Sequence, residues 1–433
     1  MSKADLSLAG GNPLIPGIGL TDPHGFISDG RVFLFATHDF SALSNDYIMK
    51  DWWVWSSCDL REWKLESILK PVDTYLGKPF NDCWAGFGVQ RNGRWYWYFS
   101  AGPKNIGVVT ADSPGGPWSD PLGIPLMGEG MISTDQRDPD ILLDDDGEAY
   151  MVFGTFNYYM VRLGRNMLSM AEAPRPVIIL NPQGPYGAGR TDDKPSLHKR
   201  NDLYYLSWSS YYATAHSVYG PYEYRGCIID STSLSPQFQH PSPTFDRHGN
   251  FFQLNGQTYF TCNDASQAGC SRYFRDSILA YVHYRDDGTM APIRIEPVGV
   301  GQYDAASGPI QAANYFLLVG GVKRESPEGW FEVQALANGS ELRYPHIKNI
   351  RGRVRLTLFF RSSGVIGGWV EARSKTGGAV LATMAIEPAS DWNILRDVSC
   401  EFSVESGELE LLLAFKGPDR EFCRLCRFTI VSV

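Results

Sequence analysis

Five residues able to carry out acid–base, stacking or metal-binding chemistry recur at equivalent places along the chain. They are Asp22, Trp84, Asp138, Asp193 and His248, and each lies eight or nine residues before a polar tight turn. Carboxylates that share a pocket of low dielectric repel one another's charge, so at least one has a raised pKa and can donate a proton at neutral pH. Hydrolysis of a glycosidic bond needs that asymmetry, with one acid at the leaving oxygen and one carboxylate that activates water or attacks.

Each of these residues also has an ordinary structural explanation. Asp22 and Asp138 precede prolines, and Asp-Pro is common where a loop enters a strand. A single histidine or tryptophan belongs to a hydrophobic core more often than to a binding site. The shared offset favours the functional explanation, because five unrelated structural residues have no reason to occupy the same place in five segments.

The five polar turns predict the elements that position these residues. Each turn is followed at once by an aromatic strand, as in Arg91-Asn92-Gly93 before Trp95-Tyr96-Trp97-Tyr98. Asn-Gly and Asp-Gly tolerate the positive φ of a two-residue hairpin. Successive turns are separated by 63, 54, 55 and 54 residues, which indicates radially repeated sheets. We therefore predict an all-β chain with a five-bladed β-propeller, in which the five residues begin the innermost strands.

The length of 433 residues favours two domains. The small, polar stretch from Gly301 to Pro309 is typical of a linker. Beyond it, residues 353–360 and 408–415 alternate between apolar and polar side chains without a helical period, which predicts a β-sandwich. We expect a propeller over residues 1–300 and a sandwich over residues 301–433.

The composition limits the partners. A net charge of −9 argues against nucleic acid and anionic membranes. No apolar stretch is long enough to span a bilayer, and the N-terminus lacks the apolar core of a signal peptide, so we expect a cytoplasmic protein. The oligomeric state cannot be predicted from these features. An oligosaccharide is the expected substrate.

The propeller segment resembles glycoside hydrolase family 43, whose members are five-bladed propellers that act by inversion on arabinosyl and xylosyl linkages. Thr21-Asp22-Pro23 is similar to the family's general-base motif, and Asp138-Pro139 is similar to the motif of the residue that tunes the pKa of the acid. Asp193-Lys194-Pro195 stands where the family has its general acid, which is usually a glutamate followed by a small residue and proline. Asp192 is the alternative acid.

The resemblance also implies binding residues. His248 matches a channel histidine that in many members contacts a calcium ion or its waters, so a calcium ion in the channel is expected. Arg275 lies near the family's substrate-binding arginine. We expect Trp84, whose indole offers a face to a sugar ring, and His24, beside the Asp22 motif, to bind substrate as well.

The C-terminal segment resembles carbohydrate-binding module family 6, through Ile310 to Tyr315. Gln311 and Ala313 replace its usual glutamates, so we expect a structural role rather than sugar binding. For the whole chain we expect an inverting, exo-acting glycosidase that releases α-L-arabinofuranosyl or β-D-xylosyl units. The alternatives are a sugar-binding propeller that has lost catalysis and a retaining hydrolase of the fructan-cleaving type.

Overall fold

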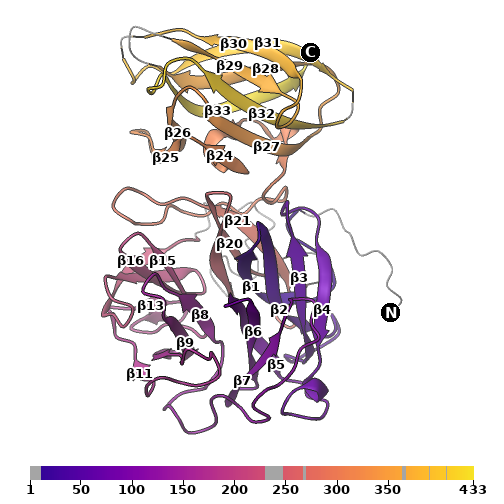
Figure 1. The fold of residues 1–433 in the computed structure, drawn as a ribbon, viewed down its shortest axis with the longest axis vertical. Helices are drawn as coiled ribbons and strands as arrows, with labels where there is room; N and C mark the ends of the chain where they lie inside the picture. The colour runs from indigo at the N-terminus through magenta and orange to yellow at the C-terminus, as the bar shows by residue number, and fades with distance from the viewer. Residues whose placement is uncertain (1–10, 230–246, 267–269, 363–366, 390, 406) are drawn as a thin grey trace. The chain divides into compact units, whose positions relative to one another are not determined.

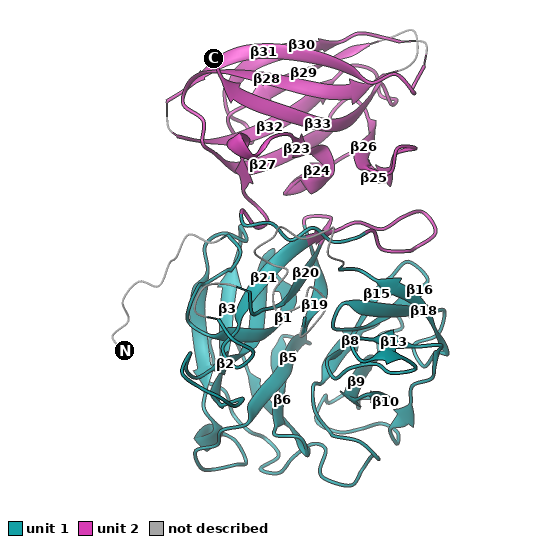
Figure 2. Ribbon diagram, turned by 180° about the vertical axis from the view of Figure 1, so that it is seen from behind, with its two compact units in different colours: residues 1–254, 259–280, 292–297 teal, residues 255–258, 281–291, 298–433 magenta. Residues whose placement is uncertain are grey.

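The computed structural model describes residues 11–229, 247–266, 270–362, 367–389, 391–405 and 407–433. The described residues form β-strands and short 3₁₀ turns, which confirms the predicted all-β class. The chain divides into two compact units (Figure 2). Unit 1 holds residues 1–254, 259–280 and 292–297, and unit 2 holds residues 255–258, 281–291 and 298–433.

Unit 1 contains five successive sheets of three to five strands in its described part (Figure 1). The first three sheets consist of β1 (Leu20–Ser28), β2 (Arg31–Asp39), β3 (Met49–Ser57) and β4 (Lys64–Leu69); of β5 (Cys83–Arg91), β6 (Arg94–Ala101) and β7 (Asn105–Ala111); and of β8 (Asp140–Leu143), β9 (Ala149–Thr155), β10 (Asn157–Arg162) and β11 (Arg175–Pro176).

The fourth sheet combines β12 (Ile179–Leu180) with β15 (Pro195–Arg200), β16 (Leu203–Trp208), β17 (Tyr211–Ala215) and β18 (Tyr222–Cys227). The fifth holds β19 (Gly249–Leu254), β20 (Gln257–Asp264) and β21 (Asp276–Val282). A separate hairpin pairs β13 (Gln183–Gly184) with β14 (Gly187–Ala188), and a 3₁₀ turn, η1, covers Pro71–Asp73.

The first strands of the five sheets form a closed ring. β1 contacts β5, β5 contacts β8, β8 contacts β15, β15 contacts β19, and β19 returns to β1. This is the arrangement of a propeller, in which the innermost strands surround a central axis. The predicted turns connect these strands to their partners, and Asn92 and Gly93 adopt φ of 52° and 76°, as a two-residue hairpin requires.

Unit 2 is built from two six-stranded sheets over one core. One sheet holds β22 (Tyr303–Asp304), β24 (Leu317–Val319), β27 (Glu341–Lys348), β29 (Gly368–Arg373), β30 (Val380–Ile386) and β32 (Glu408–Lys416). The other holds β23 (Ile310–Gln311), β25 (Val322–Glu325), β26 (Phe331–Leu336), β28 (Gly352–Arg361), β31 (Arg396–Val404) and β33 (Cys423–Ser432). Two 3₁₀ turns, η3 (Ala305–Ser307) and η4 (Ala312–Asn314), precede β23 and β24. Leu356 of β28 and Leu411 of β32 both belong to the core, as expected from alternating strands.

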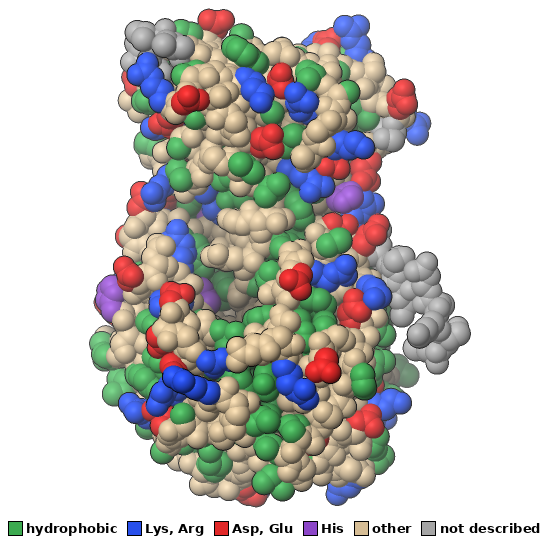
Figure 3. All heavy atoms as spheres, in the orientation of Figure 1, with side chains coloured by type: hydrophobic (Ala, Val, Ile, Leu, Met, Phe, Trp, Pro, Cys, Tyr) green, Lys and Arg blue, Asp and Glu red, His purple; other side chains and the backbone are tan. Residues whose placement is uncertain are grey.

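Charges of both signs are interspersed over the face shown in Figure 3. That face carries no broad basic surface of the kind that nucleic acid requires. In the part of the chain that the structure describes, no helix has the length and apolar character needed to cross a membrane.

Candidate active site

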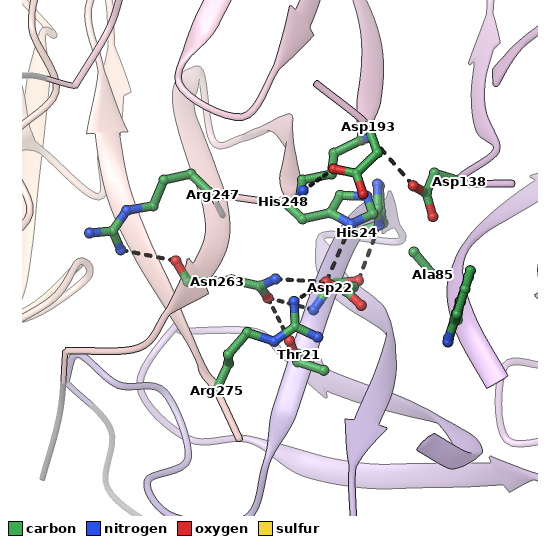
Figure 4. A network of polar contacts seen from close by, with 12 residues as sticks. Thr21, Asp22, His24, Ala85, Asp138, Asp193, Arg247, His248, Asn263 and Arg275 are labelled. Carbon is green, nitrogen blue, oxygen red and sulfur yellow. Dashed lines mark hydrogen bonds and ion pairs between the residues drawn. The ribbon is translucent and has the colours of Figure 1, made fainter. Parts of the chain in front are cut away.

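The five residues singled out by their spacing lie at the same end of the ring of strands. Asp22 and Trp84 are among the first residues of β1 and β5, Asp138 and Asp193 are two residues ahead of β8 and β15, and His248 directly precedes β19. Figure 4 shows Asp22, Asp138 and Asp193 brought together from three different sheets.

Asp22 is the centre of a network of polar contacts (Figure 4). Its Oδ1 atom accepts a hydrogen bond from Nδ2 of Asn263 at 2.6 Å and another from Nη1 of Arg275 at 3.2 Å. Nδ1 of His248 lies 3.3 Å from the same oxygen. Only 4% of Asp22 is exposed. The base candidate is thus a buried carboxylate held by three donors.

The charge state of Asp22 follows from two opposing effects. Burial on its own raises the pKa of the Asp22 carboxyl, but Arg275 and then His248 and Asn263 lower it, and the net result is a pKa well below the usual range. The carboxylate is therefore ionised throughout the neutral range. An ionised carboxylate is the form that can accept a proton from water.

Arg275 is a buried residue that joins two carboxylates. Its Nε atom donates to Oδ2 of Asp39 at 3.0 Å and its Nη2 atom to Oδ1 at 3.1 Å, while Nη1 reaches Asp22. This bidentate pair fixes the plane of the guanidinium. These contacts make Arg275 a buried partner of the base candidate, and only 3% of the residue is exposed.

Three residues before prolines at this end of the ring have left-handed backbones. The φ values are 49° for Asp22, 56° for Asp138 and 67° for Lys194. A residue before proline normally has an extended backbone. Left-handed backbones at non-glycine residues store strain and gather at functional sites. Lys194 therefore occupies the position in the fourth sheet that the aspartates occupy in the first and third, and Asp193 lies one residue earlier.

Asp193 lies among cations and is partly exposed. Nη2 of Arg137 lies 3.4 Å from its Oδ2, and Nζ of Lys194 contacts its Oδ1. Its side chain is 23% exposed, whereas that of Asp192 is 2% exposed. Oδ1 of Asp192 accepts a hydrogen bond from the Asp193 amide at 3.0 Å. A leaving group can reach Asp193, while the carboxyl of Asp192 is enclosed.

Asp138 and Trp84 border Asp193. The Lys194 amide donates to Oδ2 of Asp138 at 3.4 Å, so the loop that carries Asp193 is tied to the third sheet. The Asp138 amide donates to Oγ of Ser100 at 2.9 Å, which fixes the left-handed turn. The guanidinium of Arg137 lies 4.9 Å from the centre of the Trp84 ring. Arg137 thus connects the indole to the acid candidate, a link that the spacing of the turns did not reveal.

His24 and His248 lie against each other, with ring centroids 5.0 Å apart. Nε2 of His24 is 3.8 Å from Oδ2 of Asp140. Burial lowers the pKa of His24 to about 3, and burial raises that of Asp140 to about 7. His24 is therefore neutral, and its side chain is enclosed, with only 1% of the residue exposed.

Gly249 allows the main chain beside His248 to approach β20. A Cβ atom at this position would lie 1.8 Å from the carbonyl oxygen of Thr261. That separation is far below contact distance, so only glycine fits without moving the strand. The position of His248 thus depends on a residue that carries no side chain.

Asn263, at the end of β20, is a site residue that the sequence pattern missed. Its Oδ1 accepts hydrogen bonds from the Asp22 amide at 2.6 Å and from Oγ1 of Thr21 at 2.8 Å, while its Nδ2 donates to the Asp22 carboxylate. The spacing of the turns identifies only residues near the first strand of each sheet, whereas Asn263 lies on β20, the second strand of its sheet. No sequence signal distinguished it.

Replacing Asn263 by alanine is expected to lower kcat about 10- to 100-fold, because a hydrogen bond to a charged group is lost and the base can rotate. Asn250→Ala is the matched control, since Asn250 holds the Gly25 backbone, on the same strand as Asp22, through two hydrogen bonds and contacts no carboxylate among the described residues. Steady-state kinetics and thermal midpoints of both variants check this. Equal loss of kcat in the two variants would contradict a specific role for Asn263.

The family model for "Glycosyl hydrolases family 43" matches residues 11–290. The chain belongs to this family. The ring of sheets and the carboxylates of Asp22, Asp138 and Asp193 in Figure 4 agree with that membership. The protein is therefore a glycosidase. The resemblance predicted from the motifs of unit 1 is thus confirmed.

The similar proteins cover different shares of the chain. The chain is 26% identical over 332 residues to a xylosidase/arabinosidase from Bacteroides ovatus, with 65% of this chain and 96% of that protein covered. It is 23% identical to an arabinoxylan arabinofuranohydrolase from Bacillus subtilis, with 94% and 89% covered.

Solved structures give the same result. A family 43 β-xylosidase/α-arabinofuranosidase from a compost metagenome, in complex with xylotriose and in a calcium-free form, matches 67% of this chain and 98% of its own with 25% identity and a TM-score of 0.56. The structure of a family 43 arabinoxylan arabinofuranohydrolase from Bacillus subtilis matches 99% of each chain with a TM-score of 0.58 and 20% identity, which shows a shared fold.

Proposed function

We propose that this family 43 protein is an inverting, exo-acting glycosidase that releases terminal α-L-arabinofuranosyl or β-D-xylosyl units from oligosaccharides. The observation that carries the proposal is the pairing of a buried, ionised carboxylate, Asp22, with a partly exposed one, Asp193, at one end of the ring. The relatives named for xylosidase and arabinofuranosidase activity support the choice of sugars.

The roles follow from the surroundings of each carboxylate. Asp22 takes a proton from water as the water oxygen bonds to the anomeric carbon. Asp193 gives its proton to the glycosidic oxygen as the bond from that oxygen to the anomeric carbon breaks. Asp138, tied to the Asp193 loop through the Lys194 amide, positions the acid and tunes its charge. Asn263 and Arg275 hold the base.

Two measurements test this function. A panel of nitrophenyl glycosides identifies the sugar, and proton NMR during early turnover identifies the first anomer released. Inversion requires about 6.5–9.5 Å between the two carboxyl groups, which leaves room for water. We expect the inverted anomer. Release of the retained anomer would remove Asp22 from the role of base and favour a retaining mechanism.

A sugar-binding propeller without catalysis is the second candidate. The observation that favours it is the short side chain of Asp193, whose carboxylate is contacted by the cations of Arg137 and Lys194. Binding of an oligosaccharide by calorimetry, without turnover of any glycoside in the panel, would select this candidate.

The channel could hold a hydrated calcium ion. Nε2 of His24, Nε2 of His248 and Oδ2 of Asp140 are buried and have no hydrogen-bond partner among the residues that the structure describes. Buried polar atoms usually have a partner, and an ion with its waters would supply one here. No group of three or more His, Cys, Asp or Glu side chains among the described residues is arranged to bind a metal directly. Calcium prefers oxygen ligands, so the donor set fits an ion held mainly through its waters.

Removing calcium is expected to lower the thermal midpoint, because the three buried polar atoms lose the hydrated ion that satisfies them. Thermal unfolding before and after treatment with a chelator, followed by a calcium titration, measures this. Asp140→Asn should weaken the response. An unchanged midpoint after chelation, with no effect of added calcium, would contradict the calcium proposal without affecting the assignment of the carboxylates.

A further inference from the structure

Two aromatic side chains form an exposed pair beside the loop that carries Asp193. Phe156 is 39% exposed and Tyr186 is 48% exposed. Their ring centroids are 5.7 Å apart at an interplanar angle of 65°. The guanidinium of Arg190 lies 5.3 Å from the Phe156 ring and 5.6 Å from the Tyr186 ring. The pair thus offers apolar ring faces next to hydrogen-bond donors, which is the chemistry that recognises a sugar ring.

The backbone of Phe156 is strained and tightly held. Its φ is 60°, a conformation that is unfavourable for an aromatic residue. The Phe156 amide donates to the Asp192 carbonyl at 2.8 Å, and the Phe156 carbonyl accepts from Oγ1 of Thr191 at 2.6 Å. A strained residue that two hydrogen bonds fix in place is typical of a functional position.

The same backbone is connected to the acid candidate from two directions. Asp192, which accepts the Phe156 amide, is the residue before Asp193. Thr155, the residue before Phe156, accepts a hydrogen bond from Nε of Arg137 at 2.9 Å, and Arg137 contacts Asp193. The backbone of Phe156 is thereby held beside the loop that carries Asp193.

We propose that Phe156 and Tyr186 form the platform that binds the sugar ring on the leaving-group side of the scissile bond. This inference rests on the proposed function. Asp22 is buried and Asp193 is partly exposed, so the direction from base to acid leads outward. The ring that leaves is on the acid's side of the glycosidic oxygen, beside the exposed aromatic pair. The natural leaving group is therefore a sugar, and oligosaccharides are preferred to simple glycosides.

The variant Phe156→Gly tests the role of the ring in binding without imposing a cost on folding. Glycine favours a φ of 60°, so this variant loses the ring and relieves backbone strain. Two substrates are compared, both with the terminal sugar that the wild type releases: the glycosyl fluoride, whose leaving group has no ring, and the corresponding disaccharide. Tyr186→Ala is the second variant. Trp369→Ala, which removes an exposed ring from β29 of unit 2, is the control.

We expect kcat/KM for the disaccharide to fall roughly tenfold in Phe156→Gly and in Tyr186→Ala, with kcat/KM for the fluoride changed less than twofold. Trp369→Ala should change neither. Equal losses on both substrates, or none, would overturn the platform while the proposed function stands. If the wild type hydrolyses neither substrate, the proposed function fails first and the platform fails with it.

Discussion

Replacing Asp22 by asparagine is expected to lower kcat at least about 10³-fold on every glycoside, whatever its leaving group. Water must be activated in each case, and the asparagine amide cannot accept its proton. The substitution also leaves Arg275 with one carboxylate in place of two, so a moderate loss of stability accompanies the loss of activity. Steady-state kinetics on aryl glycosides and oligosaccharides, together with thermal unfolding, measure both effects.

Asp276→Asn is the matched control for Asp22→Asn. Asp276 is a buried carboxylate of the same unit whose Oδ1 accepts the Gly17 amide at 3.1 Å. The Asp276→Asn variant should be less stable than the wild type and should keep the wild-type kcat. Added azide provides a second test with the variant Asp22→Ala. Azide is a nucleophile that needs no deprotonation, so it should restore turnover of activated substrates, and the product should be the glycosyl azide. Full activity of Asp22→Asn would remove Asp22 from the mechanism.

Replacing Asp193 by asparagine is expected to affect substrates according to their leaving groups. Turnover of oligosaccharides should fall roughly 10²- to 10⁴-fold, since a sugar leaves poorly without a proton. Turnover of the glycosyl fluoride or a dinitrophenyl glycoside should fall far less, because these groups depart as anions. The slope of log kcat against the pKa of the leaving group measures the difference.

Asp192→Asn is the control that decides between the neighbouring acids. The enclosed carboxyl of Asp192 accepts the Asp193 amide, and the Asp192 carbonyl accepts from Oη of Tyr158 at 2.8 Å. We therefore expect Asp192→Asn to lose stability, while the dependence of its kcat on the pKa of the leaving group stays as flat as in the wild type. A steep dependence in Asp192→Asn, with a flat one in Asp193→Asn, would transfer the role of acid to Asp192.

The sequence by itself predicted the repeated sheets and the strand ends at which the candidate residues gather. Turn residues such as Asn92-Gly93 are local signals, because a tight hairpin accepts few residue types at positive φ. Their regular spacing therefore predicted the sheets, and a fixed offset from them predicted Asp22, Asp138 and Asp193. The same reasoning succeeded for the alternating strands of unit 2, where a buried face imposes a period of two.

Tertiary structure alone decided what surrounds those carboxylates. Asn263 and Asp39 reach the site from other strands, and Arg137, the neighbour of Asp138 in the sequence, contacts Asp193 of the next sheet, at sequence distances that no local pattern encodes. The left-handed backbone of Lys194, which shows that Asp193 lies one residue earlier than its counterparts in the other sheets, also appears only in the folded chain. Closing the ring brings these residues together, because β19 must pack against β1, and this contact places Asn263 of the last sheet against Asp22 of the first.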